Sequence, residues 1–375
     1  MLNANSVIGI LGGGQLGKML AEAAHKLHYR THVFSDQKDS PACLVSTFST
    51  IGAYDDEKLL KEFAAACTVV TFEFENIPLR SAEIVAEVCP LSPSLDALRI
   101  FQNRILEKSF LREQNIPCAP FAVVNDSASF DKAVREIGYP AVLKTASLGY
   151  DGKGQSAIKT PEDAVCLMKN FINNDYVLEA FVDFEAEVSI IAARAANGEF
   201  KTWGLIENEH KNHILHMSLA PATCQEKVLQ QAVSIAEKIA CGIKYVGVFC
   251  VEFFLTKNHA LLVNEVAPRV HNSGHLTIDA ARCSQFEQHI RAISGLPLEE
   301  AVISQPAVML NLLGDLWKSS EPDWQRLLAG EDIFLYLYGK KEAKNGRKMG
   351  HLTLKGEDLQ ALRKKAQYIY NKLNN

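Results

Sequence analysis

Short apolar runs alternate with helical repeats over the first part of the chain. The run Val7 to Leu11 predicts a buried strand, and the glycine turn Gly12 to Gly14 follows it. Beyond this turn, apolar residues recur at helical spacing, at Leu16, Leu20, Ala23, Ala24 and Leu27. Further strands are expected at Thr31 to Phe34 and Thr68 to Phe74. The alternation predicts a doubly wound parallel sheet, a Rossmann-like domain that we assign to residues 1–95.

The pattern changes beyond this domain. A helix-rich connector is expected over Leu91 to Leu111, and from Pro120 onward strands are separated by a glycine-rich loop. These strands and a late hairpin predict one largely antiparallel sheet, flanked by helices such as Gln230 to Ala240. The predicted strands are Ala141 to Lys144, Tyr176 to Phe181, Glu187 to Arg194 and Thr202 to Glu209.

A small third unit is expected at the C-terminal end, over residues 301–375. It carries apolar strands at Ala307 to Leu313 and Phe334 to Tyr338. The predicted fold class is therefore α/β in the first domain and α+β in the rest of the chain.

Composition narrows the class of protein. The chain has 375 residues, of which 47% are hydrophobic and 22% charged, as in ordinary globular proteins of two or three domains. Its net charge of -5 argues against a broad nucleic-acid surface. The nine cysteines form no C-x-x-C pair, which indicates reduced thiols, and no disulfide framework is expected. The N-terminus lacks a basic leader and a stretch that could span a bilayer, so a cytoplasmic location is expected.

Two acids in the late hairpin carry the clearest chemistry. Glu252 and Glu265 each lie within an apolar run, and the turn residues 256–259 separate the runs. A hairpin would bring the two carboxylates side by side, where they repel each other unless a cation lies between them. Magnesium fits, because it prefers oxygen ligands, and Asn264 offers another oxygen. The alternative is a solvated Glu252 and a local salt bridge between Glu265 and Arg269.

The first glycine turn allows more than one interpretation. Gly12-x-Gly14-x-x-Gly17 matches a dinucleotide-binding fingerprint, and Asp36 follows its last glycine by 19 residues (36 − 17). Taken alone this motif indicates a nicotinamide-dependent dehydrogenase. The turn also suits another ligand, to which Gln15 could donate directly, or plain tight packing.

A second glycine-rich loop follows a predicted strand that ends near Lys144. The loop Gly149 to Gln155 could fold over phosphates while Lys144 supplies positive charge; the alternative is a surface hairpin with solvated lysines. The segment Glu179 to Val182 could form a hinge that meets a purine, with Glu187 accepting from ribose hydroxyls, although a solvated loop is the plainer interpretation.

Three histidines at a spacing of three residues suggest a metal site only if they lie on a helix. On a strand, His210 and His216 would share one face and His213 would point to the other. The strand-like residues before them favour the strand, and a zinc site is disfavoured.

Taken together, these features resemble the ATP-grasp ligases, and among them the 5-(carboxyamino)imidazole ribonucleotide synthetases. The blocks that carry the resemblance extend over nearly the whole chain. They are residues 12–17 (GGGQLG), 71–76 (TFEFEN), 149–155 (GYDGKGQ), 264–275 (NEVAPRVHNSGH), 284–289 (SQFEQH), 338–340 (YGK) and 346–351 (GRKMGH).

The resemblance implies a fold and a reaction. The fold would be an ATP-grasp domain over residues 96–300, with a lid at about 118–182, between the Rossmann-like and small C-terminal domains. The reaction would be ATP- and bicarbonate-dependent carboxylation of 5-aminoimidazole ribonucleotide through carboxyphosphate, in purine biosynthesis. Mg²⁺ and ATP would be required, a homodimer is expected, and the metabolic partner would be the mutase that uses the product.

The resemblance also implies roles for individual residues. ATP would contact Arg104, Lys144, Gly149, Tyr150, Asp151, Gly152, Lys153, Gly154, Gln155, Glu179, Ala180, Phe181, Val182, Glu187, His210, Asn264 and Glu265. Magnesium would be held by Glu252 and Glu265. The ribonucleotide would meet Gln15, Glu73, Asp151, Lys153, Lys340 and Arg347. Bicarbonate would be bound and phosphorylated at Arg269, His271 and Asn272, which with Asp151 and Lys153 are the expected catalytic residues.

The sequence departs from the family pattern at Ala146, where many relatives carry an arginine, and Val45 to Gly52 is unusually polar for a strand.

Within the ATP-grasp group, the formate-dependent glycinamide ribonucleotide transformylase is the nearest alternative, and the C-terminal block disfavours it. The dehydrogenase interpretation leaves Glu252, Glu265 and the second glycine loop unexplained. A non-catalytic ATP-binding module would lack substrate-dependent ADP release.

Overall fold

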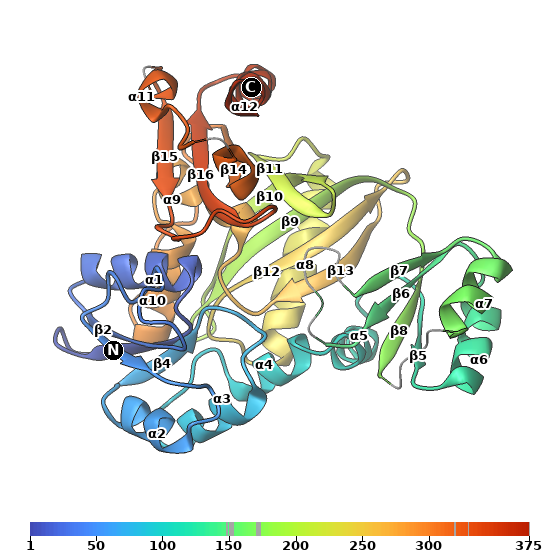
Figure 1. The fold of residues 1–375 in the computed structure, drawn as a ribbon, viewed down its shortest axis with the longest axis horizontal. Coiled ribbons are helices and arrows are strands. Elements are labelled where there is room, and N and C mark those ends of the chain that lie inside the picture. Colours follow the sequence, from blue (N-terminus) through green and yellow to red (C-terminus); the bar gives the residue numbers. More distant parts are fainter. Residues whose placement is uncertain (148, 150–153, 170–173, 319, 329, 375) are drawn as a thin grey trace.

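The computed structural model describes residues 1–147, 149, 154–169, 174–318, 320–328 and 330–374. Within this part of the chain the strands form three sheets, of four, eight and four strands (Figure 1). No helix among the described residues is long and apolar enough to cross a membrane. All nine cysteines are free thiols.

The first sheet is parallel, as the sequence predicts. Its order is β3 (Phe48–Ile51), β2 (Arg30–Ser35), β1 (Val7–Leu11) and β4 (Val69–Phe72). The helices between these strands and after them are α1 (Gln15–Lys26), α2 (Glu57–Ala65) and α3 (Leu79–Ala86). The polar segment near residue 48 forms β3, the edge strand, where most side chains are exposed and polar residues cost little.

The second sheet lies apart from the rest, on the right in Figure 1, and corresponds to the predicted lid. It is antiparallel, in the order β5 (Phe121–Val124), β8 (Tyr176–Ala180), β6 (Ala141–Thr145) and β7 (Gln155–Ile158). Helices α6 (Ser127–Ile137) and α7 (Pro161–Lys169) cover it, and it has its own apolar core around Phe130, Leu143 and Leu178. The connector helices α4 (Leu95–Phe101) and α5 (Arg104–Glu113) precede it.

The third sheet is antiparallel and contains the late hairpin. Its order is β13 (Leu261–Ala267), β12 (Gly247–Thr256), β9 (Phe184–Arg194), β10 (Phe200–Lys211), β11 (Ile214–Ala220), β14 (Ala307–Leu313), β16 (Lys348–Lys355) and β15 (Ile333–Leu337). The accompanying helices are α8 (Glu226–Gly242), α9 (Thr277–Ala280), α10 (Gln285–Ser294), α11 (Trp324–Leu327) and α12 (Leu359–Asn374), with 3-10 turns η1 (Asn272–Gly274) and η2 (Gly314–Trp317).

The prediction of one antiparallel sheet for the middle of the chain is wrong. The strands near residues 141 and 176 belong to the lid, whereas those near 187 and 202 belong to the large sheet. Apolar periodicity identifies a strand but not its partners, because every strand offers the same backbone donors and acceptors. The segment Phe181 to Asp183, between β8 and β9, joins the two sheets.

The C-terminal strands extend the large sheet. Strand β14 pairs with β11 through four register partners from Met217↔Leu310 to Ala220↔Ala307. A continuous apolar core also joins the first domain to this sheet, since Ile8 and Leu20 share it with Ile191 and Cys250. The shared core holds the first domain and the large sheet in a constant position relative to each other.

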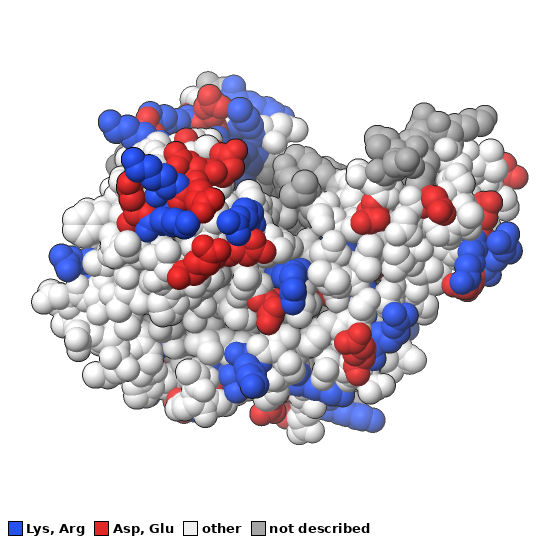
Figure 2. Space-filling view, turned by 90° about the horizontal axis from the view of Figure 1, so that it is seen from below, with Lys and Arg blue, Asp and Glu red and all other residues white. Residues whose placement is uncertain are grey.

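Charged side chains of both signs are interspersed on the face shown in Figure 2, and much of that face is neutral. Arg80 on α3 lies 3.4 Å from Glu83 and 3.6 Å from Glu87, so acids close to it in the sequence offset its charge. A broad basic field of the kind that binds nucleic acid is not seen on this face.

Candidate active site

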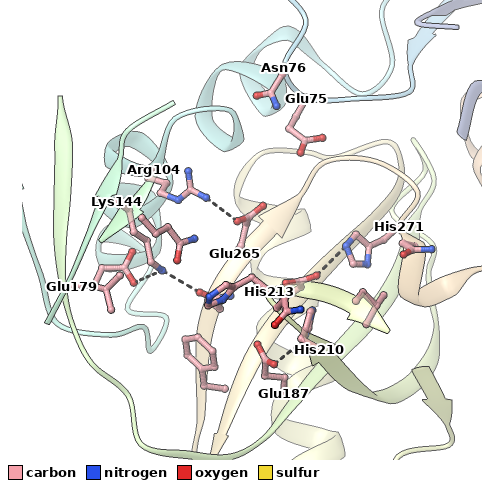
Figure 3. Close-up of a pocket in the computed structure, with 18 of the residues that line it drawn as sticks. Glu75, Asn76, Arg104, Lys144, Glu179, Glu187, His210, His213, Glu265 and His271 are labelled. Atoms are coloured by element: carbon pink, nitrogen blue, oxygen red, sulfur yellow. Dashed lines mark hydrogen bonds and ion pairs between the residues drawn. The ribbon is translucent and has the colours of Figure 1, made fainter. Parts of the chain in front are cut away.

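A cavity of about 970 Å³ lies where the three sheets converge (Figure 3). Most of the residues singled out in the sequence line it. They are Gln15, Glu73, Arg104, Lys144, Gln155, Glu179, Ala180, Phe181, Val182, Glu187, His210, Glu252, Asn264, Glu265, Arg269, His271 and Asn272.

Other expected site residues do not line the cavity. Gly149, Gly154, Lys340 and Arg347 lie outside its lining, whereas Tyr150, Asp151, Gly152 and Lys153 fall outside the described residues. The described residues of this loop are Gly149, Gly154 and Gln155. At one of them, Thr145 donates its backbone N–H to the carbonyl of Gly154 at 2.9 Å. This bond ties the loop back to β6, the strand that carries Lys144.

The predicted hairpin places its two acids directly opposite each other. Glu252 on β12 and Glu265 on β13 are register partners, and the ladder shifts immediately after them. Nε2 of His271 lies 2.9 Å from the carboxylate of Glu252, and the Arg104 guanidinium donates to Glu265 at 3.3 Å. The alternative salt bridge between Glu265 and Arg269 is wrong, because Arg269 instead binds Glu75 through two hydrogen bonds, from Nε and Nη2.

The two carboxyls differ in their electrostatics. Burial opposes ionisation of Glu252, but its contact with His271, followed by the effect of His210, lowers its pKa to about 2. Burial raises the pKa of Glu265, and the like charge of Glu252 adds to that increase. A divalent cation between them would relieve the repulsion, and the donors are the hard oxygens that Mg²⁺ prefers. The residues present therefore fit a magnesium site.

A second group of metal-binding atoms overlaps this one. Cys250, Glu252 and His271 each offer one atom, and these atoms lie within 4.8 Å of one another. Burial raises the pKa of the Cys250 thiol well above its ordinary value, followed by the effect of Glu252. A protonated thiol is a poor ligand for zinc, which binds thiolate. The oxygen pair is therefore the better cation site of the two.

The three histidines do not come together. The chain reverses at Asn212 and His213, whose φ angles are 51° and 64°. The segment is therefore a hairpin turn between β10 and β11, and neither the helix that a metal site would need nor the single strand that the sequence favours. His210 and His213 line the cavity. The His216 ring is buried and lies 4.4 Å from that of Tyr370, centroid to centroid.

Lys144 is held in a buried group of charges rather than solvated. Its ammonium lies 3.0 Å from Glu179 and 3.4 Å from Oδ1 of Asn264 (Figure 3). The other carboxylate oxygen of Glu179 lies 3.6 Å from the ammonium of Lys108, a residue that is 1% exposed. Burial opposes ionisation of Glu179, but the two lysines lower its pKa. The solvated-loop interpretation of Glu179 is therefore wrong.

The far side of the cavity offers a different set of groups. The carboxylate of Glu187 lies 2.7 Å from Nδ1 of His210. Burial disfavours the charged imidazole, but the hydrogen bond and the charge of Glu187, together with the charge of Glu252, outweigh it and raise the pKa of His210. Phe184 and Phe254 stack with ring centroids 4.8 Å apart, and both line the cavity. This side combines an apolar surface with acceptors that suit a nucleoside.

The glycine turn is filled by a protein carboxylate. Glu73, at the end of β4, accepts the backbone N–H of Gly17 at 2.7 Å and also that of Gly14. A Cβ built on Gly12 would lie 2.3 Å from the Glu73 side chain, which explains the glycine there. The donors at the start of α1 that would bind a dinucleotide pyrophosphate are therefore already paired.

The basic turn lies beside the cavity. Lys340 donates to the carbonyl of Lys348 at 2.7 Å, and Arg347 donates to that of Glu342 at 3.0 Å. Burial lowers the pKa of Lys340 to about 8, and the charge of Arg347 contributes to the lowering. The charge of Lys340 in turn opposes the rise in the pKa of Glu73, which is raised mainly by burial.

Sequence reasoning missed several residues of the cavity. Glu75, Asn76, His213 and Lys348 line it, and Lys108 supports it from behind. Glu75 and Asn76 follow the same strand as Glu73, so their position beyond a buried parallel strand was a usable signal. Lys108 gave none, since one lysine on an amphipathic helix is ordinarily solvated.

The arrangement can bind a polyphosphate together with a divalent cation. Arg104, Lys144 and Glu265 lie close together in the cavity, and His271 lies farther along it (Figure 3). Glu252 and Arg269 line the cavity as well. Such a set of groups can place positive charge around a transferring phosphoryl group next to an anionic acceptor.

Comparison with known proteins gives family matches along most of the chain. Residues 6–102 match the family described as ribonucleotide synthetase preATP-grasp domain, and residues 109–286 match the ATP-grasp domain. Residues 307–365 match the phosphoribosylaminoimidazole carboxylase C-terminal domain.

Curated relatives and solved structures match over nearly their full length. The chain is 45% identical to N5-carboxyaminoimidazole ribonucleotide synthase of Brucella melitensis, over 94% of this chain and 97% of the relative. For the Bacillus subtilis enzyme of that name the identity is 42%, over 93% and 91%. The ADP complex of an N5-carboxyaminoimidazole ribonucleotide synthetase matches with a TM-score of 0.94 at 38% identity, covering 100% and 99%. An Aspergillus clavatus synthase in complex with ADP and 5-aminoimidazole ribonucleotide matches with a TM-score of 0.90 at 30% identity, covering 99% of each chain.

Proposed function

The chain belongs to the N5-carboxyaminoimidazole ribonucleotide synthases, an ATP-grasp family, and from this premise we propose how its cavity divides the reaction among its residues. It is an ATP-dependent ligase that carboxylates 5-aminoimidazole ribonucleotide to its N5-carboxyamino product in purine biosynthesis. The match of residues 307–365 to a carboxylase C-terminal domain sets aside the formate-dependent transformylase, and the family sets aside the dehydrogenase. The Glu252 and Glu265 pair, which lines the same cavity as Lys144, supports the proposed roles best.

ATP is assigned to the part of the cavity between the lid and the large sheet. The backbone of Glu179 to Val182 and the stacked rings of Phe184 and Phe254 would hold the adenine. Glu187 and His210 would meet the ribose, since a carboxylate accepts from hydroxyl groups. Arg104, Lys144, Asn264 and the glycine loop, including Gly149 to Gln155, are assigned to the phosphates.

Glu252 and Glu265 are assigned to the magnesium ion that this family requires. When bound, the ion would supply positive charge to the phosphate oxygens during phosphoryl transfer. Lys144 would share that task, and it can leave Glu179 for the phosphates because Lys108 remains to pair that carboxylate. The buried Glu179 is thus not left without a partner when ATP binds.

Bicarbonate is assigned to Arg269, His271 and Asn272. Arg269 is oriented by its two hydrogen bonds to Glu75, and its guanidinium can attract an anion. Bicarbonate is a poor electrophile, so the γ-phosphoryl group of ATP is transferred to one of its oxygens to give carboxyphosphate. The amine of the ribonucleotide then takes up the carboxyl carbon, directly or through released CO₂, and phosphate leaves. Closure of the lid would exclude water from this intermediate.

The ribonucleotide is assigned to the side of the cavity nearest the first domain. Gln15 and Glu73 line that side, and Lys340 and Arg347 lie next to it. Asp151 and Lys153, on the lid loop, are assigned as catalytic residues from the family resemblance. Because Glu73 is held by two backbone N–H groups, we expect it to orient the aminoimidazole rather than to move during the reaction.

The remaining assignments concern organisation. We assign the boundaries 1–95, 96–300 and 301–375 to the three domains, with a lid at about 118–182 that turns about residues 181–183. A homodimer and a metabolic partnership with the mutase that consumes the labile product are proposed from the family. The nine free thiols support a reducing compartment such as the cytoplasm.

Release of ADP by the purified protein tests the function directly. Reactions containing Mg²⁺ and ATP would omit either 5-aminoimidazole ribonucleotide or bicarbonate, after carbon dioxide has been removed from the buffers. We expect rapid ADP release only in the complete mixture, with labelled bicarbonate appearing in an acid-labile product. Release that does not depend on bicarbonate would overturn the assignment of Arg269, His271 and Asn272.

A further inference from the structure

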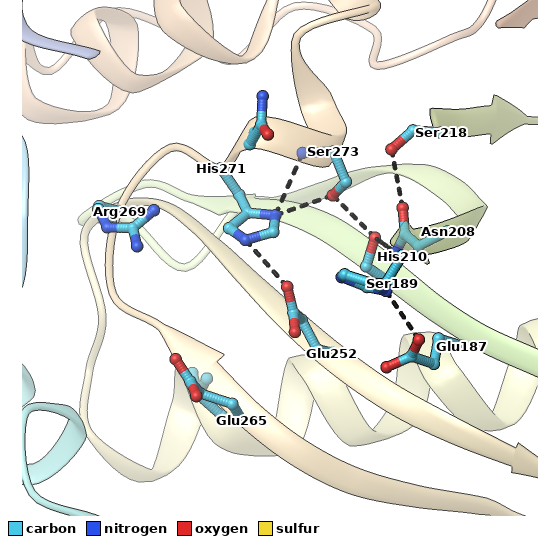
Figure 4. A network of polar contacts seen from close by, with 12 residues as sticks. Glu187, Ser189, Asn208, His210, Ser218, Glu252, Glu265, Arg269, His271 and Ser273 are labelled. Carbon is cyan, nitrogen blue, oxygen red and sulfur yellow. Dashed lines mark hydrogen bonds and ion pairs between the residues drawn. The ribbon is translucent and has the colours of Figure 1, made fainter. Parts of the chain in front are cut away.

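A buried chain of hydroxyl and amide groups runs from the large sheet to His271 (Figure 4). Ser218 donates to Oδ1 of Asn208 at 2.9 Å, and Nδ2 of Asn208 donates to Ser189 at 2.9 Å. The hydroxyls of Ser189 and Ser273 lie 2.8 Å apart, and that of Ser273 lies 2.9 Å from Nδ1 of His271.

These hydrogen-bonded groups are shielded from solvent. Ser189, Ser218 and Ser273 are each 0% exposed, and Asn208 is 7% exposed. Water therefore cannot satisfy these groups from outside, and each must find its partner inside the protein. The Cys250 thiol lies against Ser273 and Ser189, and burial keeps it neutral by raising its pKa, so it brings no charge to the chain.

The backbone fixes the role of Nδ1. His271 is the N-cap of η1, and its Nδ1 accepts the backbone N–H of Ser273 at 3.3 Å. A backbone N–H can only donate, so Nδ1 must carry a lone pair. The proton of a neutral His271 therefore resides on Nε2, which faces the carboxylate of Glu252 at 2.9 Å.

The hydroxyl protons follow from this assignment. If Nδ1 carries a lone pair, Ser273 donates its proton to it, and the Ser273 oxygen is free to accept from Ser189. The oxygen of Ser189 then accepts from Asn208, in agreement with the amide orientation that also serves Ser218. Each hydroxyl donates once, and the five contacts from Ser218 to Glu252 share one direction.

We propose that Ser273, supported by Ser189 and Asn208, is a positioning residue that holds His271 as its Nε2–H form, with that N–H directed at the carboxylate and bicarbonate end of the cavity. The role of this end rests on the proposed function above. A ring fixed in this way presents a single donor to an oxygen, whereas a freely turning ring would present a lone pair half of the time and repel it. None of the three residues lines the cavity, so they act only through His271.

Asn208→Asp and Ser273→Ala test the chain, and NMR of protein labelled with ¹⁵N in histidine provides a readout without ATP, metal or turnover. An aspartate at position 208 cannot donate, so Ser189 would give it its proton, Ser273 would donate to Ser189, and the Ser273 oxygen would face Nδ1. We expect the His271 nitrogens of the unaltered protein to show the Nε2–H pattern. In Asn208→Asp a share of protonated Nδ1 should appear, because the Ser273 oxygen would then oppose the lone pair that the backbone N–H of Ser273 still favours. In Ser273→Ala, where only that backbone N–H at 3.3 Å remains behind the ring, the share should be smaller. An unchanged pattern in both variants would overturn the proposal.

Kinetics give the second readout. Loss of the hydrogen-bond partner behind a metal-binding histidine typically costs roughly 10- to 100-fold, and we expect a similar fall in kcat here while the KM for ATP changes by less than about twofold. Ser81→Ala is the matched control, because Ser81 is also buried and bonded, to the carbonyl of Tyr54 in the first domain, far from His271. It should leave kcat and the histidine spectrum unchanged. A comparable fall in kcat in Ser81→Ala would contradict a positioning role. So would a lower melting temperature in all three variants with an unchanged histidine spectrum, because both results would indicate general destabilisation.

A wrong function and a wrong role for Ser273 would give different results. If the proposed function were wrong, the unaltered protein would show no bicarbonate-dependent ADP release, yet the histidine spectra would still report on the chain. If only the positioning role were wrong, the unaltered protein would be active and both variants would match it.

Discussion

The carboxylate of Glu73 accepts the backbone N–H of Gly17 at 2.7 Å, across 56 residues of sequence. With its second bond, to Gly14, it closes the start of α1 from within the protein. Free helix N-termini attract anions. Here the anion is the carboxylate of Glu73, which directly follows β4. The glycine turn therefore holds Glu73 at the rim of the cavity.

Replacing Glu73 by glutamine should weaken both the fold and the ribonucleotide site. The amide NH₂ of glutamine would face an N–H donor, and one buried donor would lose its acceptor, which typically costs about 1–3 kcal/mol. Chemical unfolding measures the loss of stability, and steady-state kinetics should show a raised KM for the ribonucleotide. Glu357→Gln, at an exposed position, is the control. Equal stability of Glu73→Gln and that control would show that the bonds of Glu73 to Gly14 and Gly17 contribute nothing to the stability of the fold.

Glu252→Gln and Glu265→Gln should each lower turnover at least about a hundredfold while the fold survives. Each change removes half of the formal ligand charge offered to Mg²⁺, and charge stabilisation by a metal is worth several kcal/mol in the transition state. Circular dichroism checks the fold, and ADP release is measured over a range of Mg²⁺ concentrations. Glu185→Gln, an exposed acid on β9, should behave as the unaltered protein. Near-normal turnover in either folded variant would remove that carboxylate from the metal site.

Lys144→Ala should weaken ATP-dependent catalysis without unfolding the protein. Lys108 remains to pair Glu179, so no buried carboxylate is left alone. Loss of a charge-assisted contact to phosphate costs about 1.5–3 kcal/mol, or roughly 10- to 100-fold in kcat/KM for ATP. Lys159→Ala, at an exposed position beyond β7, provides a control in the same lid. An unchanged kcat/KM for ATP would rule out the phosphate role of Lys144.

Arg347→Lys should raise the KM for the ribonucleotide, with little change in the KM for ATP. An arginine can hold a phosphate through two parallel N–H bonds, whereas a lysine supplies a point charge. Arg347→Ala and Lys340→Ala should be worse, by roughly 10- to 100-fold. Steady-state rates with each substrate varied in turn measure the two KM values. A defect confined to ATP would show that the phosphate site has been misplaced, and no change in either constant would mean a solvated turn.

The binding of the ribonucleotide should weaken above pH 8. Burial lowers the pKa of Lys340 to about 8, so its ammonium is charged below that pH and neutral above it. Attraction for an anion is therefore present at low pH and is lost as the pH rises through that value. The KM for the ribonucleotide, measured from about pH 7 to pH 9.5 where its phosphate (pKa ~6) is fully charged, should rise with pH.

The matched variant for this pH dependence is Lys340→Arg. Arginine stays protonated throughout the range, so the rise in KM should disappear in the variant. The same rise in both proteins would assign the titration to another group.

The sequence by itself determined the local elements and the chemistry that they carry. The run Val7 to Leu11, the turn after it and the helix were predicted by apolar spacing, because the spacing of buried side chains reflects the geometry of the element itself. The facing of Glu252 and Glu265 was predicted in the same way, since a short turn sets the register of the hairpin that follows it. The motifs added the family, and with it most of the residues that line the cavity.

The tertiary structure decided which distant groups meet. Apolar periodicity did not show that β6 and β8 leave the large sheet, or that β14 extends it, because the pairing edge of a strand carries no sequence signal of its own. The bonds of Glu73 to the glycine turn and of Arg269 to Glu75 join segments 56 and 194 residues apart. The ion pair of Glu179 with Lys108 and the direction of the hydrogen bonds behind His271 likewise depend on burial. A buried polar group must find its partner wherever the fold brings one, and no local pattern records where that is.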